Sequence, residues 1–394
     1  MSGTDPGLVA VAEATPPSRD RYVDFLRAAS IVAVVFGHWM QAIITWTDGR
    51  IVIHGAVGVT PGLWLTTWVM QVMPIFFFVG GFSNFVGLRS VRSGRGTTGD
   101  FLLSRLRRLG IPALVFAAAW IVVQAVLHVA DIGGSGLLRG FRLGTLPFGP
   151  LWFLGVYLVV TLTSPLTLKL HERFGLAVPS ALAVTVIGVD LLAFGALVPG
   201  IRWLNLAAVW FLVHQAGFFY GDGSLLRLSR GRIVTATVIG LAAVIVLTSI
   251  GVYPRSLVGT DVDFFALRPI ERVSNMNPPT VVILAHSVWL IGAALLLRDR
   301  LSRWLQRTAP WAATIAVNLS IMTVFLWHMT AYAIVIVLAW PLGLGREPGN
   351  TARWWMERPF WLVAPALVLA VLVAVFGRFE RGRVPRASTN PAGP

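Results

Sequence analysis

Apolar blocks of about twenty residues recur along the whole chain, and they constrain its fold more than any other feature. A transmembrane helix needs about 20 mostly apolar residues to cross the hydrocarbon core of a bilayer. The chain is 56% hydrophobic with a mean hydropathy of +0.75. Its charged residues amount to 12%, roughly half the share that is usual in soluble domains. We therefore predict an all-α fold, a polytopic transmembrane helical bundle.

Ten of these blocks are candidate spans. They cover approximately residues 23–46, 63–88, 109–130, 150–168, 177–199, 201–221, 233–253, 279–297, 311–340 and 359–377. If the N-terminus lies inside the cell, the inner segments hold 21 of the 32 basic residues. Because cytoplasmic loops of membrane proteins are enriched in Lys and Arg, we predict that both termini are cytoplasmic (N-in, C-in). The location expected is the cell membrane, plasma or inner.

The remaining segments and the composition exclude several classes of protein. We expect disordered cytoplasmic tails at 1–21 and 379–394, and one transmembrane domain at 22–378. The first 18 residues lack the basic start and short apolar core of a signal peptide. A net charge of +15 fits basic loops and anionic lipid headgroups. The chain has no long basic run interleaved with aromatics outside the apolar blocks, and this argues against nucleic-acid binding. The absence of cysteine excludes disulfides and a cysteine acyl-enzyme.

Three polar residues interrupt the first span, and their spacing is informative. Arg27 and His38 are eleven positions apart, which is three helical turns plus roughly 20°, so both face the same way with an axial separation of about 16 Å. Asp24 lies on nearly the same face and can pair with Arg27. Intramembrane ionisable residues are costly and usually functional, and a mid-membrane histidine can take a proton from a hydroxyl. The alternative is that Arg27 snorkels to the headgroups while His38 bonds a neighbouring helix.

Arginines cluster at the inner end of the third span. Arg105, Arg107 and Arg108 stand in "FLLSRLRRLGIPAL" (101–114). Guanidinium groups bind phosphates through paired hydrogen bonds, although the same residues could serve only as a topology signal. The neighbouring "GRGTTG" (94–99) has the form G-x-G-x-x-G, but no strand precedes it, and this argues against a dinucleotide site.

Further polar residues fall within the other spans. His328 and Asn318 lie in the ninth predicted span, and His214 and His286 in the sixth and eighth. Several such residues indicate a polar interior or a water-filled cavity, although single ones such as His214 and His286 are often structural. The outer loop at 259–280 holds Asp261, Asp263 and Glu271. Such a loop suits a hydroxyl-rich ligand, and it is equally compatible with a solvated loop. No metal-binding motif is present, and the histidines are scattered singly.

Five stretches, in order, carry a family resemblance. "DFLRAASIVAVVFGH" closely resembles the opening helix of the acyltransferase-3 family of integral membrane acyltransferases, which is marked by arginine, ten residues and histidine. "MPIFFFVGGF" (73–82), "SRLRRLGIPAL" (104–114), "LWFLGVYL" (151–158) and "FLWHMTAY" (325–332) resemble later segments of the same family. Gly80 stands where serine is common in the family.

The resemblance implies an acyl-CoA-dependent O-acyltransferase. The donor would be cytoplasmic acyl-CoA, with acetyl the commonest group, and no permanently bound cofactor is implied. The acceptor would be a hydroxyl of an envelope carbohydrate, glycolipid or exported metabolite. His38 would be the catalytic histidine, Arg27 a donor-site residue, and Arg105, Arg107 and Arg108 would lie near the CoA.

These expectations combine into one mechanism with one rival. The arginines would hold the CoA phosphates, Asp24 would orient Arg27, and His38 would deprotonate the acceptor or carry the acyl group. His328 and Asn318 would line the cavity or stabilise the oxyanion, while His286 and the outer-loop acids are candidates for binding the acceptor. The rival is a transporter of an anionic or sugar-containing solute, against which stands the lack of visible repeat symmetry.

Overall fold

A computed structural model describes residues 6–16, 19–47, 50–129, 148–149, 151–258 and 274–381. The helices are α1 (Pro6–Glu13), α2 (Arg21–Met40), α3 (Trp64–Met70), α4 (Met73–Arg92), α5 (Thr98–Val129), α7 (Leu151–Leu162), α8 (Ser164–Phe174), α9 (Ala177–Asp190), α10 (Leu204–Gly221), α11 (Arg230–Ser249), α12 (Val281–Trp304), α13 (Thr308–Asn318), α14 (Ile321–Ala339), α15 (Ala352–Phe376) and α16 (Arg378–Arg381). Short 3-10 turns cover Ala56–Gly58, Ile201–Trp203, Leu225–Arg227 and Trp340–Leu342, and a π-helical turn covers Leu191–Gly195. The only sheet in these described segments is a hairpin of β1 (Ala42–Thr47) and β2 (Arg50–Gly55).

The helical character of the fold confirms the predicted class. Eight helices of the described chain are long and apolar enough to cross a membrane, or nine if the bent pair α7 and α8 forms one span. We predicted ten. The predicted span at 201–221 corresponds to α10, which is absent from these eight or nine. Its buried polar residues Asn205, His214 and Gln215 reduce its mean hydropathy, which explains the difference.

Two boundaries differ from the prediction for physical reasons. The first span was expected to reach residue 46, but α2 ends at Met40 and β1 follows, pairing antiparallel with β2 from Ala42–Gly55 to Thr47–Arg50. The run "IITWT" is β-branched and aromatic, which favours a strand. The ninth span, predicted as one helix over 311–340, is divided into α13 and α14.

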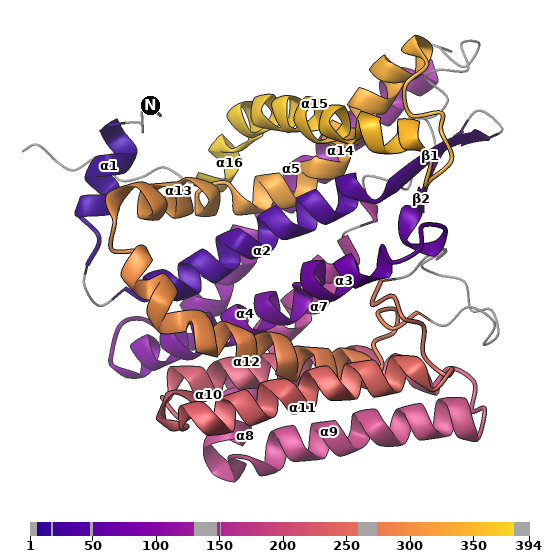
Figure 1. Ribbon diagram of the computed structural model, residues 1–394. Coiled ribbons are helices and arrows are strands. Elements are labelled where there is room, and N and C mark those ends of the chain that lie inside the picture. Colours follow the sequence, from indigo (N-terminus) through magenta and orange to yellow (C-terminus); the bar gives the residue numbers. More distant parts are fainter. Residues whose placement is uncertain are drawn as a thin grey trace, which may run out of the picture.

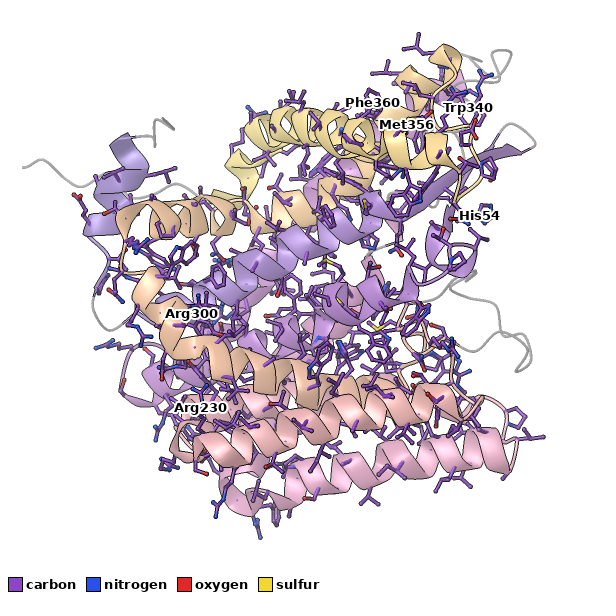
Figure 2. All side chains as sticks on the ribbon, viewed as in Figure 1. His54, Arg230, Arg300, Trp340, Met356 and Phe360 are labelled. Atoms are coloured by element: carbon purple, nitrogen blue, oxygen red, sulfur yellow. The ribbon has the colours of Figure 1, made fainter. Side chains whose placement is uncertain are left out.

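The helices form a layered bundle whose two ends differ (Figure 1). Helices α8 to α12 gather on one side and α13 to α16 on the other, with α2, α4 and α7 between them. We call the end where α2 begins the Arg21 end, and the end with β1 and β2 the hairpin end. Arg230 and Arg300 point out at the Arg21 end, whereas His54 and Trp340 lie at the hairpin end (Figure 2).

Close helix contacts at glycines fix the centre of the bundle. A Cβ on Gly81 of α4 would come 2.0 Å from the carbonyl oxygen of His214 in α10, and one on Gly217 would come 2.1 Å from that of Phe78. Only glycine permits this approach, as is common between membrane helices. The contact brings Asn84 within 3.1 Å of the His214 ring. His214 is therefore part of the packing between α4 and α10.

The Arg21 end of α2 is held by several polar contacts. Asp20 caps the helix by accepting hydrogen bonds from the backbone N–H groups of Tyr22 and Val23. The Tyr22 hydroxyl donates to the carbonyl of Ala294 over 2.6 Å, and the Tyr220 hydroxyl donates to Asp20 over 2.9 Å. These bonds attach the start of α2 to α12 and α10.

The predicted tails are partly helical. Residues Pro6–Glu13, expected to be disordered, form α1, in which Leu8 and Ala12 pack against Trp311 of α13. This apolar contact is the reason for the difference. At the other end, Glu380 of α16 accepts hydrogen bonds from the backbone N–H groups of Met322 and Thr323 at 2.9 and 2.8 Å. It thereby caps the start of α14.

Candidate active site

Two histidines from distant parts of the chain meet inside the bundle. His38, in the last turn of α2, has its Nδ1 3.1 Å from Nε2 of His328 in α14. The two rings are stacked at an interplanar angle of 26° with centroids 5.1 Å apart. His328 is fully buried and lies well inside α14, whereas His38 lies two residues before the end of α2. The pair therefore lies inside the helix bundle because His328 is in the middle of α14, although His38 is close to the end of α2.

The hydrogen bonds of this pair determine where its protons lie. Nδ1 of His328 is 2.7 Å from the carbonyl oxygen of Phe325, which can only accept, so this nitrogen carries a proton. In a neutral imidazole the other nitrogen is then an acceptor. Nε2 of His328 therefore accepts from Nδ1–H of His38. It follows that Nε2 of His38 is unprotonated and able to take a proton.

His38 belongs to the wall of a large cavity. The cavity has a volume of about 2010 Å³ and is lined by α2, α3, α7 and α10, with contributions from α4, α14, α15 and the hairpin. Its wall runs from Val34 and Phe325 in the interior to Ile53, Asn277 and Trp355 at the hairpin end. Since Nδ1 of His38 is bonded to His328, Nε2 is the ring nitrogen left for a ligand in this cavity.

A second polar group surrounds Arg27, nearer to the Arg21 end of α2. Its Nη1 lies 3.3 Å from Oδ1 of Asp24, and its Nη2 donates to the hydroxyl of Ser83 in α4 over 2.7 Å. The other oxygen of Asp24 accepts from Nε of Arg19 at 2.6 Å. Asp24 thus lies between two arginines and, together with Ser83, fixes the guanidinium of Arg27.

The arginines of α5 are divided between two faces of the helix. Arg105 donates to the backbone carbonyl of Ser83 over 3.0 Å, so it lies beside the Arg27 group. Arg108, three residues on and therefore on the same face, is close enough to repel both Arg27 and Arg105 electrostatically. Arg107 and Arg108 are both exposed, but the position of Arg107 in the helix turns it away from this face. Arg27, Arg105 and Arg108 are the set that the fold brings together.

Tyr157 of α7 fills the space next to Gly80. A Cβ at position 80 would come 2.8 Å from both Cε2 and Oη of Tyr157. Any side chain here would therefore displace the tyrosine ring. Tyr157 also lies near Arg27 and Arg105. A phenol hydroxyl consequently occupies the region that a serine side chain at position 80 would take.

The comparison with protein families decides the class of this site. The family model described as an acyltransferase domain, Acyl_transf_3, matches residues 20–378, which is nearly the whole chain. The chain belongs to the acyltransferase-3 family. No curated protein and no solved structure matches it significantly. As an acyltransferase-3 protein with eight or nine apolar helices of spanning length in its described segments, it is a multi-pass membrane O-acyltransferase.

Other predicted site residues of this acyltransferase lie away from the histidine pair. Asn318 was predicted inside the ninth span, but it is the last residue of α13. Its amide donates to the carbonyls of Asp24 and Thr314, each over 2.9 Å. His286 is buried and its Nε2 is 2.7 Å from the carbonyl of Trp68. Neither belongs to the cavity wall. Asp261, Asp263 and Glu271 lie outside the described residues.

Sequence reasoning missed three residues of the acyltransferase site. Ser83 joins Arg27 to Arg105, Tyr157 fills the space beside Gly80, and Gln41 lies in the cavity wall one turn beyond His38. Gln41 follows His38 at i+3 and could have been found from helical spacing. Ser83 and Tyr157 are ordinary polar residues in apolar segments, and only the packing of α4 against α5 and α7 shows their importance.

Proposed function

We propose that this protein transfers an acyl group from acyl-CoA to an acceptor hydroxyl, with His38 as the general base. Acetyl is the preferred donor group and succinyl or a longer chain the alternative; the acceptor is an envelope carbohydrate, a glycolipid or an exported metabolite. The observation that supports the proposal is that His38 belongs to the cavity wall while its Nδ1 lies 3.1 Å from Nε2 of His328, which leaves its own Nε2 to take a proton. Family membership supports acyl transfer in general.

The reaction proceeds by direct attack on the thioester. The acceptor oxygen forms a bond to the acyl carbonyl carbon while its proton passes to Nε2 of His38. The tetrahedral intermediate then collapses, the carbon–sulfur bond breaks, and the proton on His38 passes to the departing thiolate. The products are the O-acyl ester and free CoA, and His38 returns to its starting state.

His328 prepares His38 for this role. Its Nε2 accepts the proton on Nδ1 of His38 over 3.1 Å and so orients the ring. When His38 becomes an imidazolium, the same hydrogen bond stabilises its positive charge. The carbonyl of Phe325 holds His328 in the required tautomer. We therefore regard His328 as a positioning residue that acts through His38.

The donor binds from the Arg21 end, which is cytoplasmic in this proposal. Arg27, Arg105 and Arg108 would hold the phosphates of CoA, because guanidinium groups bind phosphate strongly. Eleven helical residues, about 16 Å along α2, separate Arg27 from His38. The extended pantetheine arm has a comparable length and can bridge the two. This arrangement suits a plasma or inner membrane, where acyl-CoA is on the cytoplasmic side.

A transfer assay with purified full-length protein in lipid nanodiscs tests the proposal. The protein is incubated with radiolabelled acetyl-CoA and an envelope glycolipid extract, and both released thiol and O-acetylated product are measured. Because a general base contributes about 100-fold or more to the rate, His38→Ala should lower transfer by at least about 100-fold. His54→Ala, which changes an exposed histidine of the hairpin, is the matched control and should keep the wild-type rate.

Two results would overturn the proposal. One is a folded His38→Ala variant that transfers acetyl at the wild-type rate. The other is label that remains entirely in CoA with acetyl-, succinyl- and longer acyl-CoA donors. Solute flux without release of CoA would support the transporter instead.

A further inference from the structure

We propose that the acceptor of this acyltransferase is an amphipathic alcohol with a large apolar body, such as a glycolipid, and not a free sugar or a soluble polysaccharide. The inference rests on the proposed function, because it assigns the cavity beside His38 to the acceptor. It is carried by the size of the cavity, by its wall and by the few polar groups that the wall leaves available.

The cavity is too large and too apolar for a small sugar. Its volume of about 2010 Å³ is about twice the upper end of the range for drug-sized ligands. Tryptophan, phenylalanine, methionine and valine make up much of the wall, including Trp152, Trp203, Trp355, Met70, Met329 and Phe211. A hydroxyl that leaves water without finding a hydrogen bond loses about 1–3 kcal/mol of binding free energy. Such a wall therefore disfavours a ligand that is hydroxylated all over.

Three polar side chains in the wall already have partners within the protein. The hydroxyls of Thr66 and Thr67 donate to carbonyls one turn earlier in α3, each over 2.6 Å. Gln71 contacts the sulfur of Met276 through its nitrogen and accepts from the backbone N–H of Met73. These groups are committed to the fold and contribute little to binding a ligand.

The available polar groups are few and begin at His38. Within the described part of the wall they are Nε2 of His38, the amides of Gln41 and Asn277, and the indole N–H groups of Trp203 and Trp355. Gln41 is three residues after His38, about 4.5 Å further along the axis, and Asn277 comes from the loop before α12. This set suits a small head with one reacting hydroxyl and one or two further polar groups. The remainder of the ligand meets apolar wall.

Part of the wall continues onto exposed apolar surface. Phe36 lines the cavity and is 42% exposed, and Val32, one turn earlier on α2, is 55% exposed and lies outside the wall. Val159 and Leu162 of α7 form a similar pair. Exposed apolar surface on a spanning helix faces lipid. An apolar chain in the cavity thus has a hydrocarbon route along α2 and α7, which a lipid-borne acceptor needs and a soluble sugar does not.

Gly155 offers a way to shorten the cavity without disturbing the fold. It lies in the wall, in the middle of α7, and a Cβ added there meets nothing within 4 Å. Leucine at this position fills part of the cavity and is a better helix former than glycine. Gly188 of α9 also has open space around its Cα but is not a wall residue. Gly188→Leu is therefore the matched control.

The test compares acceptors that differ only in their apolar part. Octyl β-D-glucoside, methyl β-D-glucoside and glucose are offered with acetyl-CoA to the protein in nanodiscs, and kcat/KM is measured for each. The octyl to methyl ratio should exceed ten in the wild-type protein. It should fall at least fivefold in Gly155→Leu and remain unchanged in Gly188→Leu. Partitioning into the nanodisc is the same for all variants, so it cancels in this comparison.

A second measurement does not depend on catalysis. A diazirine-bearing octyl glucoside is photocrosslinked to the protein, and the labelled peptides are identified by mass spectrometry. Label should map to the wall segments of α2 and α7, and octyl glucoside should compete with it whereas glucose should not. If the label maps to the wall but no acceptor is acylated, the proposed transfer reaction is contradicted, whereas the apolar binding site is supported.

The inference is overturned by any of three results. The first is equal use of glucose and octyl glucoside, with Gly155→Leu affecting both alike. The second is photolabel that maps outside the wall. The third is a Gly155→Leu variant that selectively slows palmitoyl-CoA as donor while the octyl to methyl ratio of acceptors is unchanged, in which case the cavity holds the acyl chain. In the first and third results the acyltransferase function itself stands.

Discussion

At the scale of single residues, the histidine pair makes the sharpest prediction. His328→Leu removes the acceptor for Nδ1–H of His38 while keeping similar volume, so the tautomer of His38 is no longer fixed. We expect kcat to fall by about 10- to 100-fold. His328→Gln offers a side-chain oxygen as a replacement acceptor and should retain several-fold more activity than His328→Leu. Steady-state kinetics on both variants, with thermal unfolding to verify folding, makes the comparison.

A purely structural role for His328 predicts something different. In that case activity would follow stability, and the two variants would lose kcat in proportion to their fall in Tm. Equal kcat in the leucine and glutamine variants, at equal Tm, would contradict the role of His328 in fixing the tautomer.

Gly80 makes a second prediction at this scale. A Cβ there would lie 2.8 Å from Cε2 and Oη of Tyr157, so Gly80→Ala forces the tyrosine to move. Overpacking of this kind costs about 1–3 kcal/mol of stability, and it also displaces a hydroxyl near Arg27. We expect a lower Tm and reduced transfer. Gly110→Ala in α5, where a Cβ meets nothing within 4 Å, is the control and should do neither; equal behaviour of the two variants would contradict the packing argument.

The sequence identified the charged residues of the site and the pair of Asp24 with Arg27, which the structure confirms, but not the partners on other helices. The eleven-residue interval between Arg27 and His38 placed both on one helix, as the structure has them in α2. Their contacts come from elsewhere, because Arg27 meets Ser83 of α4 and His38 meets His328, 290 positions away in the sequence. For Gly80 the sequence showed only that serine is common at this position in the family, and it did not show the neighbouring Tyr157. Helical periodicity fixes the direction of a side chain, and only tertiary packing fixes what it touches.

At the scale of elements, hydropathy located most helices but not their breaks. The first predicted span included residues 42–46 because a β-branched apolar run has the same hydropathy in a strand as in a helix. The break between α13 and α14 was likewise hidden in one long apolar stretch. It is stabilised by Glu380, which reaches the start of α14 from α16, 58 positions later. A contact of this kind leaves no local signal in the sequence.

This cap can be tested directly. Glu380 accepts from the N–H groups of Met322 and Thr323 and from the hydroxyl of Thr323 over 2.8 Å. Losing a cap at a helix N-terminus costs about 0.5–2 kcal/mol, so Glu380→Ala should lower Tm. Because α14 carries His328, transfer should fall as well. Asp299→Ala removes an acid that is 80% exposed in an ion pair with Arg298; it should change Tm little, and an equal loss in both variants would contradict the capping role.

At the scale of the whole molecule, the two ends of α2 hold different binding groups. Arg27 and Arg105 lie around Ser83 toward the Arg21 end, and the cavity extends from His38 to the hairpin end. Arg230 and Arg300 lie at the Arg21 end (Figure 2), which the positive-inside rule predicts to be cytoplasmic. In the proposed mechanism, the donor and the acceptor therefore reach His38 from opposite ends of the bundle.

This separation predicts that damage to the two approaches is independent. Arg105→Ala should raise KM for acetyl-CoA by about tenfold, since a charged hydrogen bond contributes about 1.5–3 kcal/mol, and Arg230→Ala at the same end should not. Gly155→Leu should raise KM for octyl glucoside. Mutations more than about 7–10 Å apart that share no partner add in free energy to within about 0.5 kcal/mol. The double variant, measured by steady-state kinetics with each substrate varied in turn, should show the product of the single effects on kcat/KM; a coupling above 1 kcal/mol would mean that CoA and the acceptor share one chamber.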